Sequence, residues 1–296
     1  MTRLVVLMTC HNRRAKTLAC LQALYRNRLP ENVRLDVVLV DDGSSDGTGD
    51  AVRERFPEVQ VIRGNGSLFW NGGMRRAYEA AQAHAYDHLL WLNDDTLLDG
   101  DAVERLLATE SRLHNRSGRP AIIVGSTRIP GSNVPSYGGT VRMHRLRPMR
   151  FVLIPPGTEP IECHTMNGNV VLVPREISLA LGNLEPRFVH AIGDTDYGLR
   201  ARAAGYSVWV IPGYAGTCVN DNPISGSFND VALPLAVRMR KILSPKGLPP
   251  RAWLVLTRRH AGILWPLHWV WPYLKVIMTS VACSIGIAGK RRTDNV

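Results

Sequence analysis

Short runs of aliphatic and β-branched residues alternate with helical patterns through the first third of the chain. These runs predict strands at Leu4–Thr9, Leu35–Val40, Val59–Ile62 and His88–Leu92. The intervening patterns predict helices over Arg13–Asn27, from Asp46 as N-cap to Phe56, and from a glycine-rich loop at Gly64–Gly73 through Ala83. Strands that alternate with helices form βαβ units. The pattern therefore predicts an α/β fold with a mainly parallel, Rossmann-like sheet flanked by helices.

The pattern is more mixed from about Ala121 to Gly216. It predicts strands at Ile122–Gly125 and Val170–Val173 and a helix that opens near Asp194 and runs to Ala204. A basic stretch separates these strands and contains Arg142, Arg145, Arg147 and Arg150. We expect one large domain over residues 1–233, followed by an apolar and basic helical extension over residues 234–296.

Charge is distributed unevenly along this chain. The 296 residues are 45% apolar and 21% charged, which excludes disorder, collagen and a coiled coil. The net charge of +11 at first suggests a polyanionic partner. However, residues 234–296 hold eleven Lys and Arg against one acid, Asp294, while the rest of the chain holds 25 basic and 24 acidic residues. The nearly neutral body argues against nucleic-acid binding.

The basic tail also holds four of the seven tryptophans. After Lys275 only the fourteen residues Val276–Gly289 are free of charge, fewer than the about 20 that a membrane-spanning helix needs. We expect the tail to lie in the membrane interface, with Trp and Tyr at the headgroup level and Lys and Arg facing anionic lipid. A helical hairpin buried against the domain is the alternative.

The cysteines and the start of the chain bear on location. Five cysteines form no CxxC pair and no zinc spacing, and the chain opens on a strand pattern without a secretory signal. These features predict a reduced, cytoplasmic protein, peripheral on the cytoplasmic face of the membrane.

Carboxylates follow two of the predicted strands. Asp41 and Asp42 form part of a turn, and a carboxylate placed there could accept the imide N–H of a uracil or thymine ring. Asn93, Asp94 and Asp95 follow the fourth strand, where carboxylates predict a site for Mn²⁺ or Mg²⁺. Open α/β sheets bind ligands at the carboxyl ends of their strands, so both motifs predict a ligand site.

A helix N-terminus is the alternative explanation for the aspartates after the fourth strand. Asp99 and Asp101 are better placed to cap the following helix, which leaves Asp94 and Asp95 without a structural role.

Two further segments carry candidate chemistry. The loop Gly64–Gly73, which contains Asn71, is not a dinucleotide fingerprint, because Phe69 occupies the third glycine position. Arg75, in the next helix, could meet a phosphate or lie on a solvated helix face. Asp194 opens its helix as either a cap or a catalytic carboxylate. Asp196 and Arg200 are four residues apart, which predicts a structural ion pair.

Four motifs taken together resemble a known family. Thr9–Arg13, Val40–Thr48, Leu92–Asp95 and Gly193–Asp196 are similar, in order and spacing, to the family 2 glycosyltransferases, which have the GT-A fold. The resemblance extends over about the first 215 residues. It implies that a sugar moves from a nucleotide diphosphate donor to an acceptor hydroxyl, with inversion at the anomeric carbon.

The resemblance also implies residue roles. The nucleotide-binding set would be Thr9, Asn12, Arg13, Asp41, Asp42, Asn71, Arg75, Asn93 and Asp94. Within this set Asp42 would read the base, and Asn93 or Asp94 would lie near the ribose. Asp95 would bind the Mn²⁺ or Mg²⁺ ion on the diphosphate, and Asp194 would be the catalytic base. Residues 1–120 would then bind the nucleotide sugar, and residues 121–233 would form the acceptor side.

The chain departs from the family pattern at three places. Asn93 stands where the family often has Asp, and Gly193 stands where many members have Glu. A downstream histidine sometimes completes the metal shell in GT-A enzymes, but none occurs around Cys218, so the third metal ligand stays open.

The basic, Trp-rich tail suggests a substrate at the bilayer. We expect a UDP- or dTDP-sugar donor and a lipid-linked glycan acceptor in cell-surface polysaccharide synthesis, with the stretch Arg142–Arg150 near the acceptor phosphates. A nucleotidyltransferase on a similar sheet and a non-catalytic nucleic-acid-binding protein are the alternatives.

Overall fold

The computed structural model describes residues 1–144, 146–220 and 224–284. The chain forms two compact units, the first made of Met1–Arg145 and Arg150–Asn220, the second of Leu146–Met149 and Asp221–Val296. Arg145 of the predicted basic stretch and the tail residues Lys290, Arg291, Arg292 and Asp294 lie outside the described residues.

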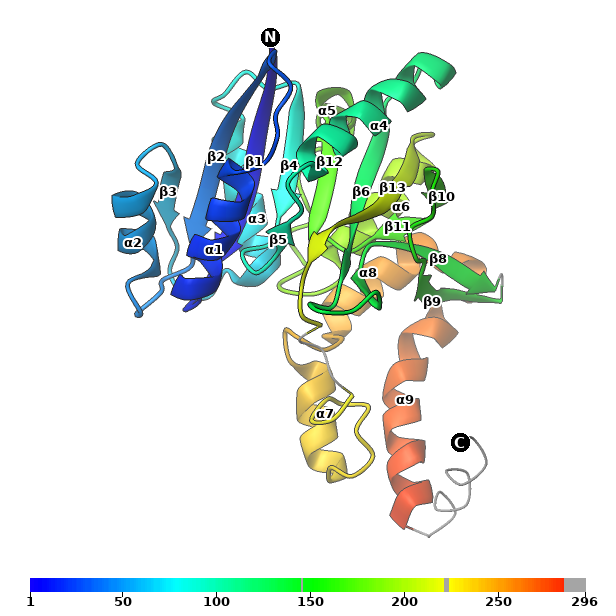
Figure 1. The fold of residues 1–296 in the computed structure, drawn as a ribbon. Helices are drawn as coiled ribbons and strands as arrows, with labels where there is room; N and C mark the ends of the chain where they lie inside the picture. The colour runs from blue at the N-terminus through cyan, green and yellow to red at the C-terminus, as the bar shows by residue number, and fades with distance from the viewer. Residues whose placement is uncertain (145, 221–223, 285–296) are drawn as a thin grey trace. The chain divides into compact units, whose positions relative to one another are not determined.

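A twisted ten-stranded sheet forms the centre of the first unit (Figure 1). Its order is β10 (Ile161–Cys163), β13 (Ser207–Thr217), β6 (Ala121–Arg128), β12 (Val170–Pro174), β4 (His88–Leu92), β1 (Thr2–Cys10), β2 (Val33–Asp41) and β3 (Gln60–Arg63), with β5 (Leu97–Leu98) on β13 and β7 (Pro135–Tyr137) on β6. Strands β4, β1, β2 and β3 are parallel, whereas β12 runs antiparallel to β4 and β6. The predicted α/β sheet is confirmed.

The central strands are apolar along their whole length because helices cover both faces of the sheet. In β1, Leu4, Val6 and Met8 belong to the core on one face, and Val5 and Leu7 belong to the core on the other. Helices α1 (Arg14–Tyr25), α2 (Thr48–Arg55) and α4 (Ala102–Ser117) pack on the first face. Helices α3 (Phe69–Ala81), α5 (Arg175–Leu181) and α6 (Gly193–Ala203) pack on the second. The result is a three-layer sandwich.

Helix α3 begins inside the predicted loop Gly64–Gly73. Its first backbone N–H groups need acceptors, and the Asp42 carboxylate supplies them by accepting from Leu68 (2.9 Å) and Phe69 (3.0 Å). An acceptor that comes from a different strand allows the helix to begin early, which a local pattern does not reveal.

The start of α4 also differs from the prediction. The Asp99 carboxylate pairs with Arg128 (2.9 Å), and the Asp101 carboxylate pairs with Arg105 (3.0 Å), so neither caps the helix through its side chain. Asn27 instead accepts the Val103 N–H at 2.9 Å. Asp101 holds the N-cap position of α4, as predicted, but neither carboxylate caps the helix, because nearby arginines pair with both.

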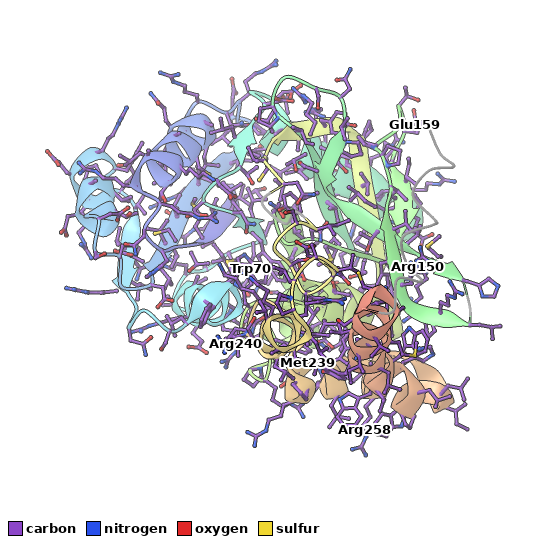
Figure 2. All side chains as sticks on the ribbon, turned by 90° about the horizontal axis from the view of Figure 1, so that it is seen from below. Trp70, Arg150, Glu159, Met239, Arg240 and Arg258 are labelled. Carbon is purple, nitrogen blue, oxygen red and sulfur yellow. The ribbon has the colours of Figure 1, made fainter. Side chains whose placement is uncertain are left out.

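A separate three-stranded sheet has the order β11 (Thr165–Met166), β8 (Gly139–His144) and β9 (Arg147–Leu153). It carries the described arginines of the basic stretch, with Arg142 on β8 and both Arg147 and Arg150 on β9. Arg150 is labelled in Figure 2.

The second unit is helical, as predicted for the tail. It contains α7 (Leu235–Leu243), α8 (Pro250–His260), a 3₁₀ turn at Gly262–Leu264 and α9 (Trp265–Ser284). The buried Arg238 of α7 donates to the hydroxyls of Thr279 and Ser280 on α9. The Trp253 indole of α8 donates to the His268 carbonyl at 3.1 Å. One side of α9 is therefore packed against α7 and α8. Within the described residues, no helix combines the length and apolarity required to cross a bilayer.

Candidate active site

The predicted motifs converge at one edge of the sheet. Strands β1, β2 and β4 are parallel neighbours, so Cys10 and Asp41, which pair at the ends of β1 and β2, lie at the same edge as the end of β4. Strand β12 runs the opposite way, and the residue before it, Asn169, accepts the N–H of Asn93 at 3.0 Å. The segment that precedes β12 therefore joins the same edge.

Hydrogen bonds fasten the turn after β1 to the turn after β2. Asn12 donates its N–H to the Ser44 hydroxyl (2.9 Å) and accepts the N–H of Ser45 at its side-chain oxygen (2.8 Å). The Nδ1–H of His11 donates to the Asp42 carbonyl at 2.6 Å. Asn12 has a left-handed backbone, with φ of 51°, which is uncommon outside glycine. The two turns form one unit, and the side-chain oxygen of Asn12 helps to hold it together.

Both predicted carboxylates of the second turn are buried and hydrogen-bonded to backbone. Asp41 accepts the N–H of Ser44 at 3.0 Å. Asp42 accepts three N–H groups, from Gly66 at 2.8 Å in addition to Leu68 and Phe69. Asp42 therefore holds the glycine-rich loop, a role that the sequence did not indicate. Its contact with a nucleotide base remains a prediction.

Arg13 bridges the two carboxylates after β4. Its guanidinium lies 2.6 Å from Asp95 and 3.4 Å from Asp94, and Thr17 donates to the other oxygen of Asp94 (3.4 Å). Burial raises the pKa of Asp94 to about 7, although the positive charge of Arg13 acts in the opposite direction. Asp94 is thus buried and covered by Arg13 and by Thr17 of α1.

Asp95 is the carboxylate on which a metal ion could bind, in competition with Arg13. Its second oxygen lies 3.5 Å from the thiol of Cys218, and both residues line a cavity of about 300 Å³ together with Lys16 and Leu97. No cluster of three His, Cys, Asp or Glu side chains that could hold a metal occurs in the described part of the chain. Mn²⁺ and Mg²⁺ can be held by one or two carboxylates when phosphate oxygens and water complete the shell. The site therefore fits an ion that arrives with a diphosphate.

Asp194 lies at the start of α6 but is not its N-cap, which is Ile192. Its carboxylate accepts the N–H of Gly168 (2.9 Å) and the N–H of Thr195 (2.7 Å). Burial raises its pKa above the usual range of an aspartate. Ile192 has φ of 66°, a left-handed conformation that is costly for a β-branched residue. Asp194 thus lies at the end of α6 with its carboxylate held by two backbone N–H groups.

The neighbouring pair on α6 is structural, as predicted. Arg200 lies 2.8 Å from the buried carboxylate of Asp196, one helical turn away.

Trp70 connects the metal motif to the segment that holds Asp194. Its indole N–H donates to the side-chain oxygen of Asn93 at 2.7 Å. Its ring lies against Gly168, where an added Cβ would be 2.4 Å from the indole carbon Cζ2. Trp70 is labelled in Figure 2. No sequence motif predicted the roles of Trp70 and Cys218, because both act through contacts that are distant in sequence.

Three predicted nucleotide-binding residues have structural partners. Asn71 is fully buried and donates to the carbonyls of Glu185 (3.0 Å) and Phe188 (2.7 Å). The early start of α3 places Asn71 in the core, and its contact with a nucleotide stays a prediction. Arg75 lies 3.6 Å from Glu79, one turn along a helix face, and its side chain is 30% exposed. Thr9 packs against Gly73 of α3, where an added Cβ would be 2.1 Å from its hydroxyl.

Comparison with known proteins identifies the family. The model for glycosyl transferase family 2 matches residues 5–168, which is more than half of the chain. The chain belongs to glycosyl transferase family 2. The family segment includes β1, β2 and β4 with all of their site turns, and it ends at Gly168, whose N–H holds Asp194.

A family relative is the galactofuranosyltransferase GlfT2 of Mycolicibacterium smegmatis, which is 28% identical over 232 residues. The match covers 69% of this chain but only 35% of the relative, so the chain spans about a third of that protein's length.

Solved structures of glycosyltransferases share the fold. S. aureus TarS has a TM-score of 0.56 at 13% identity, over 87% of this chain and 42% of TarS. The mannosyltransferase PcManGT of Pyrobaculum calidifontis, solved with GDP-Man and Mn²⁺, has a TM-score of 0.53 at 19% identity, over 95% of this chain and 75% of that one. The predicted family and the predicted GT-A fold are confirmed.

Proposed function

We propose that this family 2 protein transfers a sugar from a nucleotide diphosphate donor to an acceptor hydroxyl with inversion, and that Asp194 is the general base. One observation carries the proposal: Gly168 holds the Asp194 carboxylate while Trp70, packed on Gly168, holds Asn93 of the metal motif. A base and a diphosphate-binding carboxylate at the same sheet edge are what a single displacement needs.

The proposed step is one in-line displacement. The acceptor O–H gives its proton to Asp194 while its oxygen forms a bond to C1 of the donor sugar. The bond from C1 to the diphosphate oxygen breaks, and its electron pair leaves with the nucleoside diphosphate. The raised pKa of Asp194 makes it a stronger base than an ordinary aspartate. A divalent cation at Asp95, when bound, neutralises charge on the leaving diphosphate.

The donor would be a UDP- or dTDP-sugar. A pyrimidine is the base that Asp42 would recognise, since a carboxylate can accept an imide N–H in addition to the three backbone N–H groups that this one already accepts. The structural relatives do not decide between nucleotides, because a truncated TarS was solved with UDP and the mannosyltransferase with GDP-Man.

The test is a transfer assay with a panel of UDP-, dTDP- and GDP-sugars, with and without Mn²⁺. Asp194→Asn should abolish transfer and leave UDP affinity by calorimetry within about twofold. The control Asp50→Asn removes an exposed carboxylate of α2 and should keep full activity. Turnover retained in Asp194→Asn would overturn the base assignment. Release of pyrophosphate in place of nucleoside diphosphate would show a nucleotidyltransferase.

We propose further that the second unit docks on an anionic membrane surface, where a lipid-linked acceptor would be met. The side of α9 that is not packed on α7 and α8 exposes a row of large apolar side chains: Leu267, Val270, Trp271, Leu274, Ile277, Met278 and Val281. They recur at intervals of three and four residues, so they form one continuous apolar face along the helix. Such a face on a helix that does not span fits the membrane interface.

Charge favours lipid over a second copy of the chain. Residues 224–284 contain eight Lys and Arg and one acid, Asp230. Arg251, Arg258 and Lys275 are exposed, and Figure 2 shows Arg258 on the outer side of α8. Two copies would bring like charges together, whereas each basic side chain near an anionic surface contributes about 1 kcal/mol.

Vesicle sedimentation tests this surface. The double variant Leu267→Glu/Leu274→Glu, at positions 66% and 45% exposed, should lose binding to phosphatidylglycerol vesicles. Leu179→Glu makes the same change at a leucine of α5 that is 56% exposed and should bind as wild type does. Undiminished binding of the double variant would refute the assignment. If light scattering showed a wild-type dimer and a monomeric double variant, this face would instead be an interface between two copies of the chain.

A further inference from the structure

We propose that Trp70 and Asn93 form a recognition pair, in which the indole fixes the Asn93 amide so that its NH₂ group donates a hydrogen bond to an oxygen of the nucleotide donor. This inference deepens the proposed function and rests on it. It concerns the position at which the chain has Asn93 where the family often has Asp.

Chemistry settles the orientation of the Asn93 amide. The oxygen and nitrogen of an amide are hard to distinguish by shape, so hydrogen-bond partners must decide between them. The indole N–H of Trp70 can only donate, and it lies 2.7 Å from the amide. The atom that it meets must therefore be Oδ1, which leaves the NH₂ group as the other end of the side chain.

The indole itself is held from several sides. Its ring makes an edge contact with Trp91 at 6.2 Å between centroids, and Trp91 makes another with Tyr197 at 4.9 Å. Trp91 and Tyr197 are both buried. A second side of the Trp70 ring fills the space beside Gly168 that a Cβ would occupy. The N–H direction of Trp70 is therefore fixed before any ligand arrives.

The backbone of Asn93 is fixed as well. Its N–H donates to the Asn169 carbonyl at 3.0 Å, and its carbonyl accepts from the Cys20 thiol at 3.2 Å. The side chain is only partly buried, so its NH₂ group can reach a ligand at the strand end. A fixed backbone and a fixed Oδ1 leave the NH₂ group of Asn93 with one orientation.

The pair determines what the site can recognise. Asp94 and Asp95 already place two carboxylates next to this position, and the donor carries a diphosphate. A carboxylate at this position would offer the ligand only acceptor oxygens, whereas an amide with its oxygen occupied presents only donors. The ligand atom must then be an acceptor oxygen of a nucleoside diphosphate, either on the ribose or on the diphosphate.

Calorimetry with UDP, UMP and Mn²⁺ tests the pair. Trp70→Phe keeps the packed ring but loses the N–H, and the donor Kd should rise about threefold to tenfold, the range that corresponds to about 0.5–1.5 kcal/mol for one net hydrogen bond. Asn93→Asp should weaken UDP binding more than Asn93→Ala does, because it adds a charge. Weakening for UDP and UMP alike would identify the ribose, and weakening for UDP alone would identify the diphosphate.

Kinetics separate positioning from structural damage. In Trp70→Phe the KM for the donor should rise while the acceptor KM, kcat and Tm stay near wild type. The control Trp209→Phe makes the same substitution in β13 and should change none of them. Equal UDP affinity in Asn93→Asp and wild type would overturn the pair alone, as would a Trp70→Phe effect confined to Tm. A wild-type protein that binds no nucleoside diphosphate would overturn the proposed function and the pair with it.

Discussion

Replacing Asp42 measures how much one buried carboxylate contributes to the free energy of unfolding. It is buried and accepts the N–H groups of Gly66, Leu68 and Phe69 at 2.8, 2.9 and 3.0 Å. Asp42→Ala leaves three amides without this acceptor, and a buried donor without a partner costs about 1–3 kcal/mol. Because water can enter the space of the lost carboxylate, we expect a total loss of about 3–5 kcal/mol. This is a large part of the about 5–15 kcal/mol that stabilises a typical protein.

Urea unfolding followed by circular dichroism measures this loss. The midpoint of Asp42→Ala should fall without a change of slope, and Tm should fall by about 6–20 °C, at about 2–4 °C per kcal/mol for a large domain. The control Asp50→Ala removes a carboxylate that is 87% exposed and pairs with Arg53 at 2.8 Å, so its midpoint should hardly move. An unchanged midpoint in Asp42→Ala, together with lost UDP binding, would refute the loop-holding role and favour base recognition alone.

Four further expectations follow from the same site. Asp194→Asn should have a higher Tm than wild type at pH 7. Burial raises the pKa of Asp194 on folding, so the ionised carboxylate lowers the stability of the folded state at any pH above the unfolded pKa of about 3.9. The difference in Tm should disappear as the pH falls below that value. The hydrogen bond from the Thr48 hydroxyl lowers the pKa of Asp46, so this carboxylate stabilises the folded state above about pH 4 and loses that effect as the pH falls further. Asp46→Asn should therefore lower Tm only at the higher pH. Gly168→Ala should clash with Trp70 and displace the Gly168 N–H that holds Asp194, so kcat in the transfer assay should fall at least tenfold. Asp95→Ala should remove the Mn²⁺-dependent part of UDP affinity in calorimetry, and equal Mn²⁺ dependence would count against Asp95 as the metal ligand.

The strands were predictable because their cause is local. A strand such as β1 is covered on both faces, so its run of aliphatic residues appears directly in the sequence. The turns that follow β1, β2 and β4 meet because parallel strands end at one edge, which is a property of the fold class. The main outline of the site could therefore be predicted before any contact was known.

The remaining contacts depend on side chains that are far apart in sequence. Trp70 meets Asn93 across 23 positions, and Cys218 meets Asp95 across 123. The burial of Asn71 in α3 could not be predicted either, because it lies within the glycine-rich stretch that the sequence predicts as a loop. Its burial follows from Asp42, which starts α3 early by accepting the first N–H groups. No local pattern contains that information.

The left-handed backbone at Asn12, Phe69 and Ile192, with φ of 51°, 54° and 66°, has a consequence for engineering this protein. Glycine adopts such angles without steric cost, whereas a residue held there costs about 1–3 kcal/mol. Glycine substitutions normally weaken a protein, but at Phe69 and Ile192 the relief of backbone strain offsets part of that loss. A search for thermostable variants would therefore be drawn to the two positions that precede Trp70 and Asp194. Gains selected there would come at the expense of the geometry on which turnover depends.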